Sequence, residues 1–316
     1  MDEFELIRRY FSKDTVKRAD VALGVGDDAA LLRVPAGHEL AVTTDSLIPG
    51  VHFPADLVAD AVGHRALAAN LSDLAAMGAE PAWMLLALTL PEVAEAWLEG
   101  FSRGFFALAE KHRTALVGGN IARGPLNITI TAQGFVPKDQ ALARKGAQPD
   151  DLIFVTGHPG DAAQGLKLLQ SGKVDMQDAC VRRFAYPEPR IEAGMALRGL
   201  VTACIDISDG LLADLGHILD ASGTGATILT AKLPLSKRLL QLQGMDAAQR
   251  LALTGGDDYE LLFTAPHAWQ AEIERKLEEA GCPVACIGSV EAQPGLRCLE
   301  ASGHGLTLSE MGYKHF

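Results

Sequence analysis

The chain lacks the features that mark several large classes of protein. Its longest apolar run, 82–90, contains Thr89 and ends at Pro91, well short of the roughly 20 residues that span a membrane. The first ten residues mix charged side chains with short apolar stretches and show no signal-peptide pattern. No cysteine precedes Cys180, and the 5 cysteines follow neither a zinc-binding nor a disulfide spacing. We therefore expect a soluble, cytoplasmic protein with reduced thiols and no membrane association.

Basic side chains are also too few for a protein that binds nucleic acid. Lys and Arg total 28 against 40 Asp and Glu, which gives a formal net charge of −12. Binding to a phosphate backbone needs a basic surface, so this balance argues against a nucleic-acid partner. An acidic protein can still bind phosphates when metal ions lie between the charges. The length of 316 residues suits one large or two medium domains.

Two common solutions to nucleotide binding are missing as well. The sequence has no GxxxxGK[ST] motif and no GxGxxG motif after a strand, which excludes the P-loop and Rossmann designs. It also offers no convincing Ser/His/Asp or Cys/His set that could supply a protein nucleophile. Any chemistry on phosphates must therefore rest on other residues.

Strand-like and helical patterns alternate along the chain, which predicts an α/β or α+β fold. The strands are expected at 39–44, 115–117, 127–135, 152–156, 201–207, 259–264 and 284–287. The helices are expected at 4–10, 60–77, 92–112, 162–169, 190–198, 211–221 and 268–280. Pro, Gly and Asp interrupt the apolar rhythm between residues 137 and 151. We therefore predict two domains, 1–147 and 148–316.

Aspartates recur in glycine-flanked turns near the ends of the predicted strands. Gly24–Ala30 contains Asp27 and Asp28, and the run Thr43-Thr44-Asp45 closes the strand at 39–44. Adjacent carboxylates repel each other unless they are protonated, hydrogen-bonded or shared with a cation. Hydroxyl and carboxylate oxygens together suit magnesium. Each motif alone is equally compatible with an acidic turn or an Asx turn.

Asp73 occupies an unusual position in the helix predicted at 60–77. At 3.6 residues per turn it falls on a stripe of small residues, between Ala69 and Ala76, where close packing is expected. An unpaired carboxylate buried there would be strongly unfavourable. Asp73 is therefore expected to be paired or bound to a metal ion.

Two further acidic turns lie in the second half of the chain. The apolar strand at 201–207 contains Asp206 and leads through Ser208-Asp209-Gly210 into a helix that contains Asp214. The start of a helix favours anions, and one acid could serve as its cap. Both acids together indicate metal ligation beside a bound phosphate. The turn 255–260 is acidic too, and Gly118-Gly119-Asn120 is expected to form a glycine turn after a strand.

The ordered motifs resemble the thiamine-monophosphate kinase family along essentially the whole chain. They are GVGDDAALL at 24–32, TTDS at 43–46, HF at 52–53, NLSDLAAMGA at 70–79, GGN at 118–120, TGHPGDAAQGL at 156–166, DISDGL at 206–211 and GGDDYEL at 255–261. The family belongs to a superfamily of ATP-dependent enzymes that includes aminoimidazole ribonucleotide synthase. The resemblance implies two α/β domains, the first of which pairs across a homodimer.

The resemblance also assigns roles to individual residues. It implies several Mg²⁺ ions, with ligands at Asp28, Thr43, Thr44, Asp45, Asp73, Asn120, Asp206 and Asp209. It implies ATP contacts at Gly119, Asn120, Arg144 and Ser208, and thiamine monophosphate contacts at His52, Asp257 and Tyr313. The family usually has aspartate where this chain has Asn120, so one metal position is expected to be weaker or shifted.

The implied reaction is the transfer of a phosphoryl group from ATP to thiamine monophosphate, which gives thiamine diphosphate. The alternative is another ATP-dependent synthetase of the same superfamily. Selenophosphate synthesis would require a reactive cysteine near the N-terminus, and none precedes Cys180. A non-catalytic calcium-binding protein would carry EF-hand loops, which the sequence does not contain.

Overall fold

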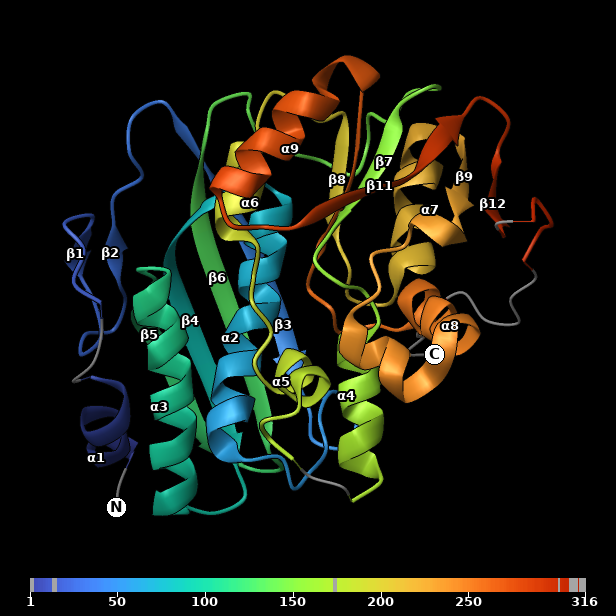
Figure 1. Cartoon of the computed structure of the whole chain (residues 1–316). Coiled ribbons are helices and arrows are strands. Elements are labelled where there is room, and N and C mark those ends of the chain that lie inside the picture. Colours follow the sequence, from blue (N-terminus) through green and yellow to red (C-terminus); the bar gives the residue numbers. More distant parts are fainter. Residues whose placement is uncertain (1–2, 13–15, 173–174, 301, 307–311, 313–316) are drawn as a thin grey trace. The chain divides into compact units, whose positions relative to one another are not determined.

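The computed structural model describes residues 3–12, 16–172, 175–300, 302–306 and 312 (Figure 1). It divides into two compact units. Unit 1 comprises the described residues up to Leu74 together with Ala79–Asp139, and unit 2 comprises Ala75–Gly78 and the described residues from Gln140 onward. The segment 140–147, which the sequence assigns to the first domain, packs within unit 2, where the backbone N–H groups of Gly146 and Ala147 donate to Ser222 Oγ.

Unit 1 is built on a four-stranded sheet with the strand order β3-β6-β4-β5. The strands are β3 (His38–Leu47), β4 (Glu80–Leu90), β5 (Ala115–Arg123) and β6 (Asn127–Pro137). The helices α2 (Ala59–Ala76) and α3 (Glu95–Lys111) lie side by side on one face of this sheet (Figure 1). The unit begins with α1 (Glu3–Leu6) and a π-helix (Ile7–Phe11), and it includes the small antiparallel pair β1 (Val21–Leu23) and β2 (Leu31–Leu32).

The other face of this sheet is only partly covered. Trp83 and Phe135 meet edge to face at 4.9 Å between ring centroids, and together with Val117 they pack against Val21 and Leu32 of the small pair. Elsewhere the sheet carries exposed hydrophobic side chains, namely Leu40, Val42 and Leu85. Burial of Trp83, Phe135 and Val117 stabilises the packing of the small pair on this face.

Unit 2 is built on a six-stranded sheet with the strand order β12-β9-β11-β7-β10-β8, in which only β12 and β9 are parallel among the described strands. The strands are β7 (Leu152–Thr156), β8 (Ala203–Asp206), β9 (Gly225–Leu229), β10 (Leu261–Ala265), β11 (Val284–Glu291) and β12 (Gly295–Leu299). The helices are α4 (Asp161–Gln170), α5 (Ala179–Ala185), α6 (Ile191–Ala196), α7 (Leu211–Ser222), α8 (Lys237–Thr254) and α9 (Gln270–Glu279). Two 3₁₀ turns occupy Thr230–Lys232 and His267–Trp269.

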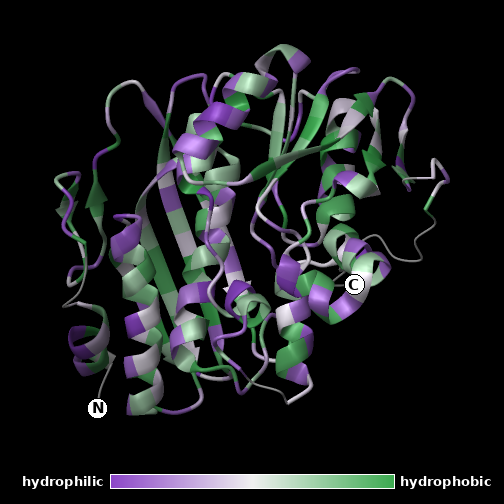
Figure 2. Ribbon diagram, viewed as in Figure 1, coloured by the Kyte–Doolittle hydropathy of each residue, from purple (hydrophilic) through white to green (hydrophobic). Residues whose placement is uncertain are grey.

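The core of unit 2 forms because α7 lays an apolar face on the sheet. Leu215 and Leu219 of this helix join a buried cluster with Val155, Ile205 and Leu262, whose side chains share one face by strand alternation. Figure 2 shows the strands of this sheet as predominantly hydrophobic, while α9 alternates between hydrophilic and hydrophobic turns. Among the described residues, no helix is both long enough and apolar enough to cross a membrane.

The structure corrects one local expectation. Gly118-Gly119-Asn120 does not form a turn after a strand, because β5 continues through these residues to Arg123 and pairs in parallel with β4. Gly119 has a φ of 153°, and a Cβ there would lie 1.9 Å from the carbonyl oxygen of Leu86. The glycine therefore permits a close approach of two strands.

The contact between α2 and α3 depends on a glycine. A Cβ at Gly104 would lie 1.9 Å from the carbonyl oxygen of Asp60. We expect Gly104→Ala to lower the free energy of unfolding by about 1–3 kcal/mol, because the helices must move apart. Gly216→Ala in α7 is the control: nothing lies within 4 Å of its Cβ position, so we expect the free energy of unfolding to rise by about 1 kcal/mol. Equal effects of the two variants in urea denaturation would contradict this account.

Candidate active site

Two carboxylates face each other between β3 and α2. Thr43 Oγ1 donates a hydrogen bond to Asp73 Oδ2, so the face of β3 that carries Thr43 is the face toward α2. Alternation along the strand places Asp45 on that same face and Thr44 on the opposite one. Thr44 Oγ1 instead donates to the carbonyl oxygen of Ile130. The structure thus brings together Thr43, Asp45 and Asp73, but not the Thr44 side chain.

The electrostatics of this pair are unfavourable to two negative charges. Burial first, and the neighbouring Asp73 carboxylate second, raise the pKa of Asp45 to about 6. A hard divalent cation would relieve both effects, because carboxylate and hydroxyl oxygens are its preferred ligands. The donor set of Asp45, Asp73 and Thr43 therefore fits magnesium.

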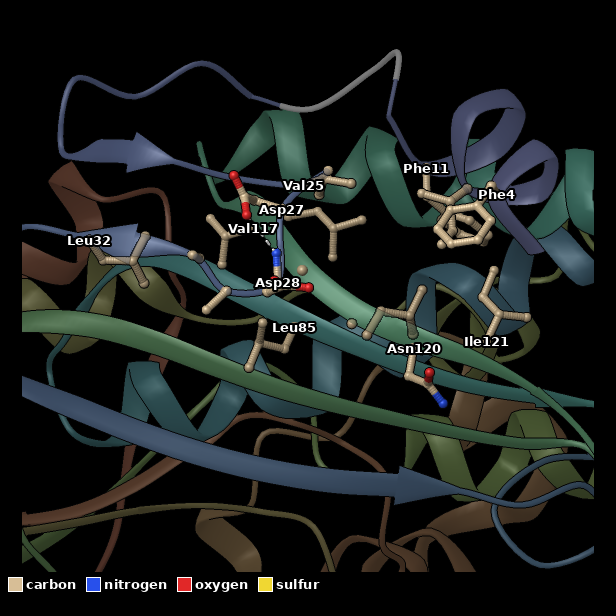
Figure 3. Close-up of a pocket in the computed structure, with 18 of the residues that line it drawn as sticks. Phe4, Phe11, Val25, Asp27, Asp28, Leu32, Leu85, Val117, Asn120 and Ile121 are labelled. Atoms are coloured by element: carbon tan, nitrogen blue, oxygen red, sulfur yellow. Dashed lines mark hydrogen bonds between the residues drawn. The ribbon is translucent and has the colours of Figure 1, made fainter.

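A cavity of about 780 Å³ opens elsewhere in unit 1 (Figure 3). Its lining contains Asp27 and Asp28 from the first acidic turn, and Gly119 and Asn120 from β5. Phe4 and Phe11 from the N-terminal helices, together with Ile121, form an apolar end near Asn120 in Figure 3. The Asp28 N–H donates to Asp27 Oδ1 at 2.9 Å, which orders the turn. The cavity thus combines exposed carboxylates with an apolar wall.

The cavity also contains a polar side chain that sequence reasoning missed. Gln133 is 9% exposed, and its Oε1 has no hydrogen-bond partner among the described residues. A buried acceptor without a partner is unfavourable by roughly 1–3 kcal/mol. The signal in the sequence was an amide in the interior of the strand predicted at 127–135, among apolar and hydroxylated residues.

The predicted substrate residue His52 has a defined tautomer. Its Nδ1 accepts a hydrogen bond from the backbone N–H of Ile48 at 3.0 Å, so in the neutral ring Nε2 carries the proton. Arg65 Nη2 donates to the carbonyl oxygen of His52 at 3.2 Å, which fixes the loop on α2. The neutral ring therefore presents a donor rather than an acceptor.

In unit 2, the Asp206–Gly210 turn is organised by an acid that the sequence left without a role. Asp214 Oδ2 accepts the backbone N–H groups of Ser208, Asp209 and Gly210 at 3.0–3.1 Å. The sequence allowed one acid to cap the start of this helix, and Asp214 is the acid that accepts these N–H groups. Burial is the main reason that the pKa of Asp214 rises to about 6. Asp206 is 4% exposed at the end of β8.

The remaining predicted residues are distributed as follows. Asp257 is partly buried in the turn before β10, and Ser208 and Arg144 are exposed. Tyr313 lies outside the described residues. Within the part of the chain that the structure describes, no three His, Cys, Asp or Glu side chains cluster closely enough to hold a metal ion. Within unit 1, Asp45 lies near Asp73, and Asp28 and Asn120 line the cavity; within unit 2, Asp206 and Asp209 belong to the same turn.

Known families share both halves of this architecture. The family described as AIR synthase related protein, N-terminal domain, matches residues 26–136, and its C-terminal counterpart matches residues 148–299. The fold is also shared by a structure of the hydrogenase maturation protein HypE in complex with ATP, which is 21% identical with a TM-score of 0.78. The chain is thus an AIR synthase-related protein, and the predicted two-domain fold is confirmed.

Full-length relatives narrow the family further. Thiamine-monophosphate kinase of Escherichia coli is 48% identical over 318 residues, which cover 99% of this chain and 98% of the relative. The crystal structure of thiamine-monophosphate kinase from Stenotrophomonas maltophilia is 44% identical, with a TM-score of 0.89 over 97% of this chain and 98% of that one. A structure described as AaThiL complexed with AMPPCP and TMP is 34% identical, with a TM-score of 0.79 over 92% of each chain. The chain belongs to the thiamine-monophosphate kinase family.

The role of Asp214 can be tested by stability. We expect Asp214→Ala to lower the free energy of unfolding by about 1–3 kcal/mol, because it leaves buried N–H groups without an acceptor. Asp220→Ala, on the exposed side of the same helix, should change it by less than about 0.5 kcal/mol. Chemical denaturation followed by circular dichroism measures both. A stable Asp214→Ala variant would show that the turn does not need this acceptor.

Proposed function

We propose that this protein transfers the terminal phosphoryl group of ATP to thiamine monophosphate, which yields ADP and thiamine diphosphate. The observation that carries the proposal is the full-length match to the structure described as AaThiL complexed with AMPPCP and TMP. The match to curated thiamine-monophosphate kinases at up to 48% identity supports the same reaction. This would be the last step in the synthesis of thiamine diphosphate.

Mg²⁺ is the proposed cofactor. Asp45, Asp73 and Thr43 would hold one ion, since the two carboxylates repel each other in its absence. Asp28 and Asn120 at the cavity, and Asp206 and Asp209 in unit 2, are the further proposed ligands. Bound Mg²⁺ would neutralise phosphate charge and reduce the repulsion between the two anionic substrates. Asn120 offers an oxygen without a charge, so its ion would be held more weakly.

The side chains of the protein bind and orient rather than attack. The acceptor is a phosphate oxygen that needs little deprotonation at neutral pH, so no protein base is required. Gly119, Asn120, Arg144 and Ser208 are proposed to contact ATP. His52, which presents an Nε2 donor, would contact thiamine monophosphate together with Asp257 and Tyr313. Asp257 supplies a negative charge for the thiamine cation.

The cysteines argue against the alternative of a thiol-dependent synthetase. All five are unpaired, and only Cys286 is not fully buried. Burial raises the pKa of Cys180 to about 12 and of Cys298 to about 11, so neither thiol ionises at neutral pH. Unpaired thiols also support the proposed cytoplasmic location, where they stay reduced.

The uncovered face of the sheet in unit 1 supports a homodimer. Leu40, Val42 and Leu85 are 42%, 59% and 37% exposed on that face. A row of exposed hydrophobic side chains on a sheet is typical of a surface that another chain covers. A second copy of this chain is the proposed occupant.

The proposed reaction is tested by incubating the protein with ATP, Mg²⁺ and thiamine monophosphate, and measuring thiamine diphosphate by chromatography. We expect one ADP for each thiamine diphosphate. Thiamine without a phosphate is the control acceptor, and it should give no thiamine diphosphate because it lacks the phosphate oxygen that attacks in the proposed reaction. Absence of thiamine diphosphate from the complete mixture would refute the kinase assignment.

The Asp45–Asp73 pair predicts how the stability responds to magnesium. Mg²⁺ should raise the Tm of the protein, because it binds the native state only. Asp45→Asn removes one of two repelling charges, so it should maintain or raise the Tm without metal and reduce the increase with Mg²⁺. Asp56→Asn, at an exposed position, should keep the full increase. If Asp45→Asn responded to Mg²⁺ like the native protein, the pair would not be a metal site.

A further inference from the structure

The turn Gly255–Glu260 contains three acids with different surroundings. Asp257 is partly exposed, whereas Asp258 is 4% and Glu260 0% exposed. Asp257 and Tyr259 adopt φ values of 67° and 51°, which L side chains rarely do. A bulky residue in this region is strained by roughly 1 kcal/mol or more. Other contacts must therefore hold the turn in this shape.

Glu260 makes the strongest of these contacts. Arg183 Nη2 donates to its Oε1, and Arg190 donates from Nη2 to Oε1 at 2.6 Å and from Nε to Oε2 at 2.7 Å. Burial alone would raise the pKa of Glu260, but the hydrogen bonds and charge of Arg190, with the charge of Arg183, lower it. Gly157 leaves the space, since a Cβ there would lie 1.9 Å from Oε1.

Thr156 couples this carboxylate to the backbone that follows the turn. Its hydroxyl donates to Glu260 Oε2 at 2.6 Å and accepts the backbone N–H of Leu261 at 2.8 Å. Asp258 anchors the other side, since its carboxylate accepts the N–H groups of Gly160 and Ala162 at the start of α4. The inward-facing acids thus tie the turn to β7 and α4.

The same turn lies against the loop that is proposed to hold metal and ATP in unit 2. The N–H of Asp257 donates to the carbonyl oxygen of Ser208 at 2.8 Å, and that of Tyr259 donates to Ile207 O at 2.9 Å. The Tyr259 hydroxyl also contacts Asp257 Oδ1 at 3.4 Å. Any relaxation of the left-handed backbone would displace the Asp257 carboxylate from this loop.

We propose that Glu260 and Thr156 are positioning residues, which lock the strained turn so that Asp257 meets the cationic part of thiamine monophosphate. Neither needs to touch a substrate. The inference rests on the proposed function, because it assumes that Asp257 contacts the thiamine cation. It predicts a larger defect for thiamine monophosphate than for ATP, since Asp257 lies in the turn itself, whereas Ser208 meets the turn only through its backbone carbonyl oxygen.

The test compares Thr156→Val with Thr156→Ser, which keeps the hydroxyl. Thr156→Val should raise KM for thiamine monophosphate about five-fold, the effect of roughly 1 kcal/mol on binding, and should raise KM for ATP by a smaller factor. Thr156→Ser should restore KM to within about two-fold, a difference of roughly 0.4 kcal/mol. Thr264→Val is the matched control, because Thr264 is also fully buried and bonds Thr202 Oγ1 at 2.6 Å at the far end of β10. It should lower Tm to a similar extent without raising either KM.

A second pair of variants covers the case in which Thr156→Val does not fold. Arg183→Gln removes one of the two cations on Glu260, while Arg190 still neutralises it. Arg238→Gln breaks the ion pair of Arg238 with Asp178, which lies elsewhere in unit 2. Only the first should raise KM for thiamine monophosphate.

The outcomes separate this inference from the proposed function. Native protein that makes no thiamine diphosphate would refute the function itself. If the native protein is active but the Thr156→Val and Thr264→Val variants have the same KM for thiamine monophosphate, the positioning role is overturned. The positioning role is also overturned if Thr156→Val or Arg183→Gln raises KM for both substrates by the same factor, because the substitution would then disturb the structure of the whole site.

Discussion

A carboxylate removed from water needs either hydrogen-bond donors or a cation, and this requirement organises both units. Three buried acids of unit 2 meet this requirement internally. Glu260 has two arginines and a threonine, while Asp214 and Asp258 accept backbone N–H groups. In unit 1, Asp45 faces Asp73. Burial and repulsion by Asp73 raise the pKa of Asp45 to about 6, and no hydrogen bond or positive charge from the described residues offsets this increase. The acids that have partners shape the fold, and the acids that repel each other form the proposed metal site.

Adjacent acids in the sequence therefore do not share a role. Asp257 and Asp258 are neighbours, yet Asp258 caps the start of α4 and Asp257 remains partly exposed. The sequence predicted that the turn is functional, but it could not assign a separate role to each acid. These roles depend on which carboxylate accepts the backbone N–H of Gly160, which is distant in the sequence. Likewise Asp214 was passed over within its helix, although its carboxylate reaches back to three N–H groups of the preceding turn.

Local patterns predicted local structure well. The apolar run 152–156 became β7 with the same bounds, and the small-residue stripe of α2 did bring Asp73 to a hydroxyl of β3. The sequence did not predict the strands and helices whose pattern of buried and exposed residues depends on contacts with distant parts of the chain. The stretch 80–90 is buried on both sides around Trp83, so β4 lacks the alternation of a half-buried strand. α8 contains Gly244 with a φ of 72° inside it, which breaks the helical period.

The charge balance explains why phosphate chemistry in such an acidic protein would need external cations. The two arginines closest to the acidic turn of unit 2, Arg183 and Arg190, are already engaged by Glu260. Turning either toward a phosphate would remove one of the two arginines from this buried carboxylate. Arg144 is exposed, where solvent screens its charge. The proposed neutralisation of two anionic substrates would therefore fall to cations that arrive with the nucleotide, and the repelling pair Asp45 and Asp73 is an arrangement that a cation would stabilise.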